Sequence, residues 1–355
     1  MDKRYFSDKI VKWYKSNKRS LPWRQTRDPY KIWLSEIILQ QTRVSQGLPY
    51  YEQFVREYPT VHALAEADEQ NVLRLWQGLG YYSRARNLHK CARVVIARHN
   101  GVFPSTYTEL LSLPGIGAYT AAAIASISRR EPMAVVDGNV FRVLSRAFGV
   151  EHAINSPEGK KKFTVLANEL LDIERPDLHN QAVMEFGALF CTPKNPNCGE
   201  CIFQNSCFAF NKNLQHALPV KLKAKASRKR YFYYIVLVHA NALCMRKREE
   251  KDIWQGLFDF HLIEKTRPLK SEKIVSDQLF KKLVKKPGEL TVSKNYKHVL
   301  SHQTIFSRFI IVKGKKRAVS SEKNGAFYSF DQIARLPKPV LISRFLSDHY
   351  HQLQN

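Results

Sequence analysis

Residues 113–128 read LPGIGAYTAAAIASIS, and this stretch decides the fold of the first part of the chain. Gly115 and Gly117 flank the apolar Ile116, and a run of small, helix-compatible residues follows. Two glycines this close predict a tight turn in which backbone N–H groups can approach a phosphate at a helix N-terminus. The pattern is typical of a DNA-binding helix-hairpin-helix. Taken alone, it also fits an ordinary turn between two helices.

The residues on both sides of this hairpin predict further helices. Apolar residues recur at helical spacing between Pro, Gly and capping residues. We therefore expect residues 1–218 to form an all-α domain, with helices that include 29–44, 45–57, 69–77, 84–99, 118–128 and 139–148.

Four of the six cysteines lie within 17 residues, with the spacing Cys-x6-Cys-x2-Cys-x5-Cys. In a cytosolic chain, where thiols stay reduced, such a group indicates a metal site rather than disulfides. Four thiolates suit either a structural zinc ion or an iron–sulfur cluster, and the spacing alone leaves both open. The candidate ligands are Cys191, Cys198, Cys201 and Cys207.

Length and charge set wider limits on fold and function. A chain of 355 residues is long enough for two domains. Lys and Arg number 57 against 31 Asp and Glu, so the net charge of +26 favours nucleic acid as the partner. Charge alone also allows a ribosomal, membrane-surface or heparin-type partner. No stretch approaches the roughly 20 apolar residues of a membrane span, and no secretory signal is visible. We therefore expect no membrane contact and a cytosolic location.

Two carboxylates are candidates for chemistry on a glycosidic bond. Asp137 lies just before an amphipathic helix, where it could cap the helix or stabilise positive charge developing on a sugar. Glu36 lies among apolar neighbours in WLSEIILQQT, where burial would raise its pKa and suit it as a general acid. A Glu that reaches water from the rim of the core fits the same pattern. Together they supply the two carboxylates that such cleavage requires.

From Pro219 the chain changes character. The segment PVKLKAKASRKR, residues 219–230, has six basic residues and no acidic one, which predicts a solvated linker or a phosphate-binding strap. β-rich runs follow, such as YFYYIVLVHANALCMRK, WQGLFDFHLIE and HQTIFSRFIIV, with one helix-like segment near 272–285. We expect a separate α+β domain over residues 231–355.

These features together closely resemble the MutY adenine DNA glycosylases, and the similarity covers about residues 20–220. The cysteine spacing is that of the [4Fe–4S] loop, here 191–207, that this family shares with endonuclease III enzymes. The resemblance therefore implies one [4Fe–4S] cluster rather than zinc. The motifs that carry it are Glu36 with Gln40-Gln41-Thr42, Gly78-Leu79-Gly80-Tyr81-Tyr82-Ser83-Arg84, the glycine hairpin, Asp137-Gly138-Asn139 and the four cysteines.

The resemblance assigns roles to the residues of the active site. Adenine would flip into a pocket, where Glu36 protonates its N7 and Asp137 stabilises the resulting oxocarbenium ion. Tyr119 and Asn139 would line the sugar side, with Asn139 orienting Asp137, while Glu185 helps to order Glu36 and water. In endonuclease III relatives a catalytic lysine lies two residues after the second glycine of the hairpin. Here that residue is Tyr119, so we expect a hydrolytic, monofunctional glycosylase with weak or no lyase activity.

The resemblance also supplies DNA contacts. Flipping a base costs a few kcal/mol, which side chains inserted into the duplex must offset. Gln41 and Tyr81 are the candidates for this role, although Gln41 also fits an ordinary exposed glutamine. The other expected DNA-binding residues of the helical domain are Arg24, Arg84, Gly115 and Gly117.

Residues 231–355 resemble the MutT-like, Nudix-fold domain with which these glycosylases read 8-oxoguanine opposite adenine. The Gly-x5-Glu-x7-Arg-Glu box is missing, so pyrophosphatase activity is not expected. Residues 296–302, YKHVLSH, match the family's Phe-Ser-His recognition loop, with Leu300 where Phe is usual. The change removes an aromatic contact, whereas Ser301 and His302 keep their hydrogen-bonding groups. His298 and His302 could hold a metal only on a helix, and the β-type pattern argues against one.

The sequence thus predicts a base-excision-repair enzyme that removes adenine opposite 8-oxoguanine or guanine from double-stranded DNA. We expect a monomer in the bacterial cytoplasm, associated with the nucleoid. Two alternatives remain: a thymine- or pyrimidine-removing glycosylase of the same superfamily, and a non-catalytic DNA-binding or redox-sensing protein in which the carboxylates are structural.

Overall fold

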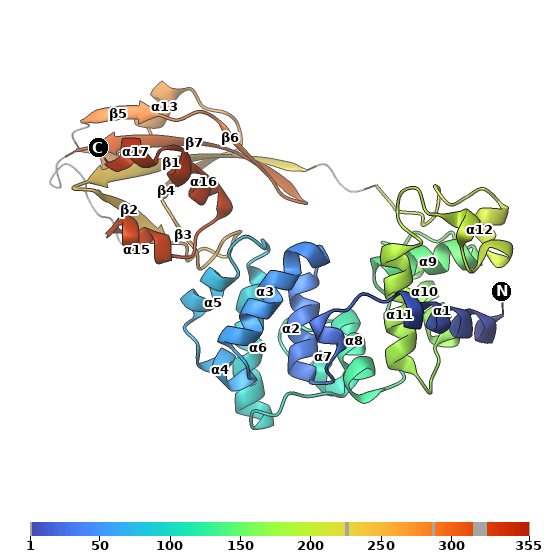
Figure 1. Cartoon of the computed structure of the whole chain (residues 1–355). Helices are drawn as coiled ribbons and strands as arrows, with labels where there is room; N and C mark the ends of the chain where they lie inside the picture. The colour runs from blue at the N-terminus through green and yellow to red at the C-terminus, as the bar shows by residue number, and fades with distance from the viewer. Residues whose placement is uncertain (1, 224–226, 286–287, 315–324, 355) are drawn as a thin grey trace. The chain divides into compact units, whose positions relative to one another are not determined.

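The computed structural model describes residues 2–223, 227–285, 288–314 and 325–354. The chain divides into two compact units, Met1–Glu66 with Asn87–Ala224, and Ala67–Arg86 with Lys225–Asn355 (Figure 1). The first unit is helical and the second contains the sheet, so the expected order of an α fold and an α+β fold is confirmed. The limits 1–218, 219–230 and 231–355 stay predictions, and residues 224–226 of the basic linker lie outside the described residues.

Several helices of the first unit begin at a polar residue whose side chain caps them. Asp28 accepts a hydrogen bond from the backbone N–H of Tyr30, and Pro29 follows it at the first helical position. Asp137 caps α9 in the same way. The α-helices that lie wholly in this unit are α1 (Lys3–Asn17), α2 (Pro29–Leu39), α3 (Val44–Glu57), α4 (Val61–Glu66), α7 (Tyr107–Leu111), α8 (Ala118–Arg129), α9 (Gly138–Phe148), α10 (Pro157–Leu170), α11 (Pro176–Leu189) and α12 (Phe208–Asn211).

One helix is shorter than the sequence predicted. We expected a helix over 29–44, but α2 ends at Leu39 because Gln40 leaves the helical conformation and Gln41 adopts a left-handed one, with φ of 56°. The apolar periodicity continues across this turn, so the pattern alone could not show the break. The other five expected helices agree with the structure to within two residues at each end.

The core of the first unit is rich in aromatic side chains where α1, α9, α10 and α11 meet. Phe6 stacks on Phe203 with 5.0 Å between ring centroids, and Phe163 and Phe186 are equally buried. Burying a side chain of this size contributes about 1.5–3 kcal/mol. The cysteine loop is attached to this core, since three of its cysteines pack against it: Cys191, Cys201 and Cys207.

In the second unit β1 (Arg228–His239) is the central strand. It pairs in parallel with β7 (Gln303–Lys313) and antiparallel with β2 (Ala242–Lys247) and β4 (His261–Lys265). Its residues 232–238 are all buried, which explains the unbroken apolar run as a strand covered on both faces. The other strands described in this sheet are β3 (Phe258–Asp259), β5 (Glu289–Val292), β6 (Tyr296–Val299) and β8 (Gly325–Ser329).

Short helices complete the second unit. The helix expected near 272–285 is two helices, because Asp277 caps a new one with its carboxylate. Helix α16 packs on the sheet, where Phe345 stacks on Phe309 with 3.8 Å between ring centroids. The helices described are α5 (Glu69–Leu75), α13 (Ser271–Val275), α14 (Gln278–Leu283), α15 (Phe330–Arg335), α16 (Val340–Asp348), α17 (Tyr350–Gln354) and the first residues of α6 (Ser83–His99).

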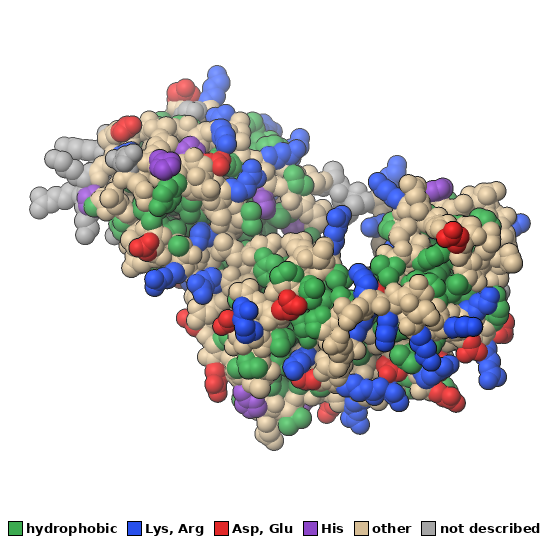
Figure 2. Space-filling model, in the orientation of Figure 1, with side chains coloured by type: hydrophobic (Ala, Val, Ile, Leu, Met, Phe, Trp, Pro, Cys, Tyr) green, Lys and Arg blue, Asp and Glu red, His purple; other side chains and the backbone are tan. Residues whose placement is uncertain are grey.

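The surface is basic. Lys and Arg side chains are spread over the face drawn in Figure 2 and outnumber Asp and Glu, as the composition requires. Such a surface attracts a polyanion. Among the described residues, none of the helices has the length and apolar character needed to span a bilayer.

Candidate active site

A cavity of about 200 Å³ lies in the first unit, between elements that are far apart in the sequence. Its wall comes from the segment around the 3-10 helix η1 (Pro22–Arg24), from α2, from the start of α8, from the turn before α9 and from α11. Since a water molecule takes up about 30 Å³ in the liquid, this cavity has room for several waters. The structure brings all five predicted catalytic residues to its wall: Glu36, Tyr119, Asp137, Asn139 and Glu185.

Glu36 is the carboxyl group best suited to carry a proton. The hydroxyl of Tyr119 donates a hydrogen bond to Glu36 Oε2 at 2.7 Å. Burial raises the pKa of Glu36 to about 7 and the Asp137 carboxylate adds to the rise, whereas the bond from Tyr119 opposes it. A carboxyl group with this pKa is protonated in a large fraction of molecules at neutral pH, which suits a general acid.

Asp137 both caps a helix and lines the cavity. Its Oδ1 accepts a hydrogen bond from the backbone N–H of Val140 at 2.7 Å, and its Oδ2 accepts one from Asn139 Nδ2 at 2.8 Å. Burial raises the pKa of Asp137, and these hydrogen bonds oppose that rise. The two functions that the sequence left open are therefore compatible, and the bond from Asn139 holds one oxygen of Asp137 in place.

Glu185 is fully occupied by arginines. Arg24 donates to both of its carboxylate oxygens at 2.7 Å, and Arg19 donates to Glu185 Oε1 through Nε and through its backbone N–H, each at 2.9 Å. Burial alone would raise the pKa of Glu185, but these hydrogen bonds lower it to about 2. Glu185 is thus a permanent anion that anchors Arg19 and Arg24 at the cavity wall. The predicted DNA contact Arg24 is only 14% exposed there.

The sequence analysis missed two residues of this site. Arg19 lies 166 positions from Glu185, and no local pattern connects them. Arg142 donates to Asn139 Oδ1 at 2.9 Å and to the carbonyl of Cys191 at 2.7 Å. One buried guanidinium therefore connects the residue that orients Asp137 with the first cysteine of the loop. A buried arginine inside an amphipathic helix was the only signal available for it.

The glycine hairpin joins α7 to α8 as expected. Gly115 has φ of +80°, and a Cβ there would lie 2.8 Å from the Cβ of Asn87, so only glycine fits. Gly117 caps α8, and a Cβ at this position would meet no atom within 4 Å. The backbone at the start of the twelve-residue α8 is therefore accessible, as a phosphate contact requires.

The two candidates for insertion into DNA share an unusual backbone. Gln41 has φ of 56° and Tyr81 has φ of 47°, a region that side-chain-bearing residues rarely adopt. Both side chains are exposed, Tyr81 by 40%. Strained, exposed residues are frequent at functional sites. Arg84 supports the turn around Tyr81, since its Nη2 donates to the carbonyl groups of Leu79 and Gly80 at 3.3 and 3.2 Å.

The four cysteines follow α11 in the loop 191–207. Burial, together with the charges of the other three thiols, raises the pKa of Cys201 to about 12, so four thiolates here need a compensating cation. Within the described ranges no three Cys, His, Asp or Glu side chains converge tightly enough for a single metal ion. Four cysteine thiolates, one for each ligated iron, are the usual ligands of a [4Fe–4S] cluster, so the donor set of this loop fits that group.

The segment that matches the recognition loop is a β-hairpin. β6 pairs antiparallel with β7, and the backbone N–H of Leu300 donates to the carbonyl of Gln303, which leaves Leu300, Ser301 and His302 at the tip. His298 lies on a strand, so the helical metal pair with His302 is ruled out. A second cavity, of about 290 Å³, lies within the second unit, and its lining includes Tyr81, Trp254, Leu300 and His302.

Three family descriptions match the chain. The HhH-GPD superfamily of base excision DNA repair proteins matches residues 34–169, and the NUDIX domain matches residues 233–348. The iron-sulfur binding domain of endonuclease III matches residues 191–207. The last match covers the segment from the first to the last of the four clustered cysteines.

Named relatives match either most of the chain or about three fifths of it. An adenine DNA glycosylase of Buchnera aphidicola subsp. Schizaphis graminum is 33% identical over 94% of this chain and 96% of its own length. The human adenine DNA glycosylase is 41% identical over 60% of this chain and 41% of its own. A thermostable thymine-DNA glycosylase is similar in structure, with a TM-score of 0.55 and 30% identity over 59% of this chain and 97% of that one. An endonuclease III–DNA intermediate, at 22% identity, has a TM-score of 0.53 and covers 60% of this chain and 99% of its own.

Proposed function

Because the chain belongs to the adenine DNA glycosylase family, we propose that its cavity takes an adenine flipped out of double-stranded DNA and that Glu36 and Asp137 cleave the glycosidic bond. The observation that carries this proposal is the placement of two carboxyl groups in one cavity, one of them with its pKa raised to about 7. Such a pair can divide the work, one group as proton donor and the other as anion.

The reaction requires a proton transfer to adenine and the addition of a water molecule to the sugar. Protonated Glu36 gives its proton to adenine N7 as the bond between N9 and C1′ breaks, so adenine leaves as a neutral base. Asp137, at the N-terminus of α9, stabilises the positive charge left on the sugar. A water molecule then adds its hydroxyl to C1′, and the remaining proton of that water passes to Glu36. Tyr119 occupies Glu36 Oε2 and leaves the other oxygen for the transfer.

The same site argues for hydrolysis without strand cleavage. Tyr119 stands at the start of α8, two residues after Gly117, and offers a phenol rather than an amine. The cavity wall contains no lysine among the residues that line it. A Schiff base with the sugar therefore has no nucleophile at this position. The [4Fe–4S] cluster held by Cys191, Cys198, Cys201 and Cys207 serves as a structural element, since glycosidic hydrolysis transfers no electrons.

The opposite base is the finer part of the proposal. We infer that 8-oxoguanine or guanine pairs with the adenine that is removed and that the hairpin tip with Ser301 and His302 reads it. Gln41, Tyr81, Arg84, Gly115 and Gly117 contact the DNA, and the exposed, left-handed positions of Gln41 and Tyr81 support insertion. The enzyme acts as a monomer, in the cytoplasm with the bacterial nucleoid. Light scattering on the purified enzyme with and without duplex tests the monomer.

Removal of thymine is the alternative that a relative suggests. The thymine-DNA glycosylase resembles 59% of this chain, whereas the adenine glycosylase relative matches 94%, including the C-terminal domain. The test is single-turnover base release from duplexes with adenine opposite 8-oxoguanine, guanine or thymine and with thymine opposite guanine, each with and without hot alkali. We expect adenine release opposite 8-oxoguanine and guanine, with strand breaks only after alkali. Thymine release instead of adenine release would overturn the proposal.

A further inference from the structure

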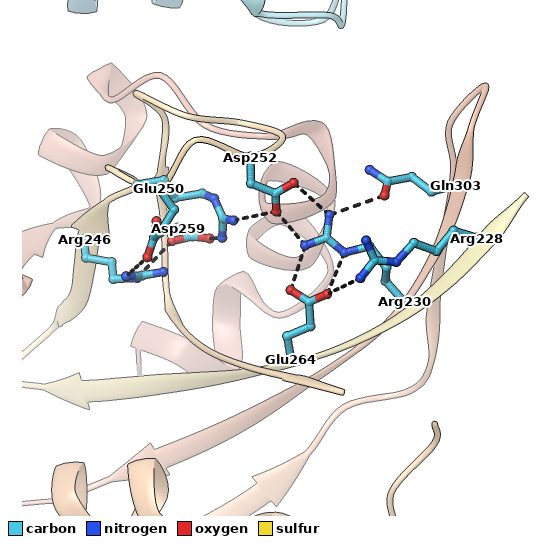
Figure 3. Close-up of polar contacts among 9 residues, drawn as sticks. Arg228, Arg230, Arg246, Glu250, Asp252, Asp259, Glu264 and Gln303 are labelled. Atoms are coloured by element: carbon cyan, nitrogen blue, oxygen red, sulfur yellow. Dashed lines mark hydrogen bonds and ion pairs between the residues drawn. The ribbon is translucent and has the colours of Figure 1, made fainter. Parts of the chain in front are cut away.

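One arginine of the second unit has all of its hydrogen-bond donors in use. Arg230 lies on β1 and is 5% exposed. Its Nε and Nη2 donate to the two carboxylate oxygens of Glu264, both at 2.7 Å, and its Nη1 and Nη2 donate to those of Asp252 at 3.0 and 2.5 Å (Figure 3). The fifth bond runs from Nη1 to Gln303 Oε1 at 3.3 Å. A guanidinium has five N–H groups, so the set is complete.

These partners come from the segments that form the second cavity. Asp252 lines that cavity itself, and Trp254 lies two residues further along the same loop. Gln303 directly follows His302, the lining residue at the hairpin tip. Arg230 therefore joins the loop to the hairpin, both of which line the cavity, while Glu264 on β4 holds Arg230 to the sheet.

The loop has a conformation that needs such support. Trp254 has φ of 62°, an unfavourable backbone angle for a bulky residue. Its side chain is nevertheless buried, with only 7% of its surface exposed. Its ring lies edge-on to His298 of β6, with 5.5 Å between centroids. Trp254 thus supplies an aromatic ring to the cavity close to the hairpin in which Leu300 replaces the aromatic residue usual in this family.

The remaining wall comes from Leu79–Ser83 and Arg86, which belong to the same unit. Arg86 Nη1 donates to the carbonyl of Gln255 at 2.6 Å, next to Trp254 in the loop. Each shift of this loop would therefore change the distance between Trp254 and the hairpin, and with it the width of the cavity.

We propose that Arg230 is a positioning residue that, through Asp252 and Gln303, sets the spacing between Trp254 and the hairpin tip, and so determines how strongly the enzyme prefers 8-oxoguanine over guanine opposite adenine. The inference rests on the proposed function, because it takes the second cavity to receive the opposite base. Lysine cannot replace Arg230, since one ammonium group cannot hold two carboxylates and an amide in a planar fork.

The experiment compares single-turnover adenine release opposite 8-oxoguanine with release opposite guanine, in the parent and in three variants of the full chain. Arg230→Lys keeps the charge, Asp252→Asn removes the loop carboxylate that Arg230 holds, and Gln303→Met removes only the link to the hairpin. Lys265→Arg is the control, because Lys265 pairs with Asp277 in the same unit and neither residue lines the cavity. Melting curves check that each variant folds.

We expect the ratio of the two rates to fall about fivefold in Arg230→Lys and in Asp252→Asn, less in Gln303→Met, and not in Lys265→Arg. A purely structural role would lower both rates together and leave the ratio unchanged, and that result overturns the inference. If Arg230→Lys does not fold, the other two variants decide in the same way. If the parent enzyme releases adenine equally fast opposite 8-oxoguanine and guanine, the proposed reading of the opposite base is wrong. The parent alone shows that result, so it is distinguished from a failure of the inference about Arg230.

Discussion

Tyr119→Phe tests how the active site sets the acidity of Glu36. The change removes the hydroxyl that donates to Glu36 Oε2 at 2.7 Å and leaves the ring in place. This hydrogen bond favours the ionised carboxylate, so its loss raises the pKa of Glu36 above its value of about 7. A hydrogen bond to a charged group contributes about 1.5–3 kcal/mol, and one pKa unit corresponds to about 1.4 kcal/mol. We therefore expect a rise of about one to two units.

Because the acid must be protonated, the rate of adenine release falls as the pH rises through this pKa. Single-turnover rates between pH 5 and 9.5, at saturating enzyme, give the position of this fall. It should move from near pH 7 in the parent to about pH 8–9 in Tyr119→Phe, even if the maximal rate is lower. Tyr30→Phe is the control, since the Tyr30 hydroxyl donates to the carbonyl of Tyr58 and the residue does not line the cavity. An unchanged or more acidic fall in Tyr119→Phe would refute this account of Glu36.

Three further outcomes follow from the contacts. Asp137→Asn retains a side chain that caps α9, so we expect a normal melting temperature but a rate of adenine release lower by about a hundredfold or more, which melting curves and single-turnover assays will check. Glu185→Gln should lose about 3 kcal/mol of stability at neutral pH, because the pKa of Glu185 is about 2 against an ordinary 4.5. The stabilisation by ionised Glu185 is complete above pH 4.5 and is lost as the pH falls toward 2. The difference in unfolding free energy between Glu185→Gln and the parent should therefore narrow over that range. An equal difference at all pH values would contradict this role of Glu185. Removal of iron by oxidation and chelation should abolish the visible absorption and lower the melting temperature. The reason is that Arg142 and Arg146 donate to backbone carbonyl groups of the cysteine loop and depend on its shape. An unaltered melting curve would show that the cluster does not support the fold.

Local patterns in the sequence account for much of the fold and the site. Asp137 could be placed at a helix start because a cap, a glycine and an amphipathic run lie together. The glycine hairpin was equally local, since Gly115 needs a positive φ and Gly117 leaves the helix start open. The apolar run in residues 231–238 predicted a β-strand, and β1 is present there with residues 232–238 buried.

Contacts between distant segments could not be predicted in this way. The pairing of Glu185 with Arg19 and Arg24 joins residues more than 150 positions apart, and the partners of Arg230 lie on a loop and two strands. An arginine in a basic segment gives no sign that it will be buried. The DNA contact that the resemblance implies for Arg24 stays a prediction, and its pairing with Glu185 at the cavity wall is a contact that the sequence did not indicate.

The sequence also could not predict unusual backbone conformations. The left-handed angles of Gln41 and Trp254 depend on the packing of the segments around them, and neither residue type indicates such an angle. The end of α2 at Leu39 follows from the first of these angles. The left-handed angle of Trp254 shapes the second cavity.

The proposed mechanism has Glu36 donate the proton that releases adenine. Its most direct test is single-turnover adenine release by Glu36→Gln from a duplex with adenine opposite 8-oxoguanine, beside binding of the same duplex and beside the exposed control Glu66→Gln. We predict that Glu36→Gln binds the duplex as the parent does but releases adenine slower by about a hundredfold or more, because an amide has no proton to transfer. Release at the parent's rate, with normal binding, would contradict the account.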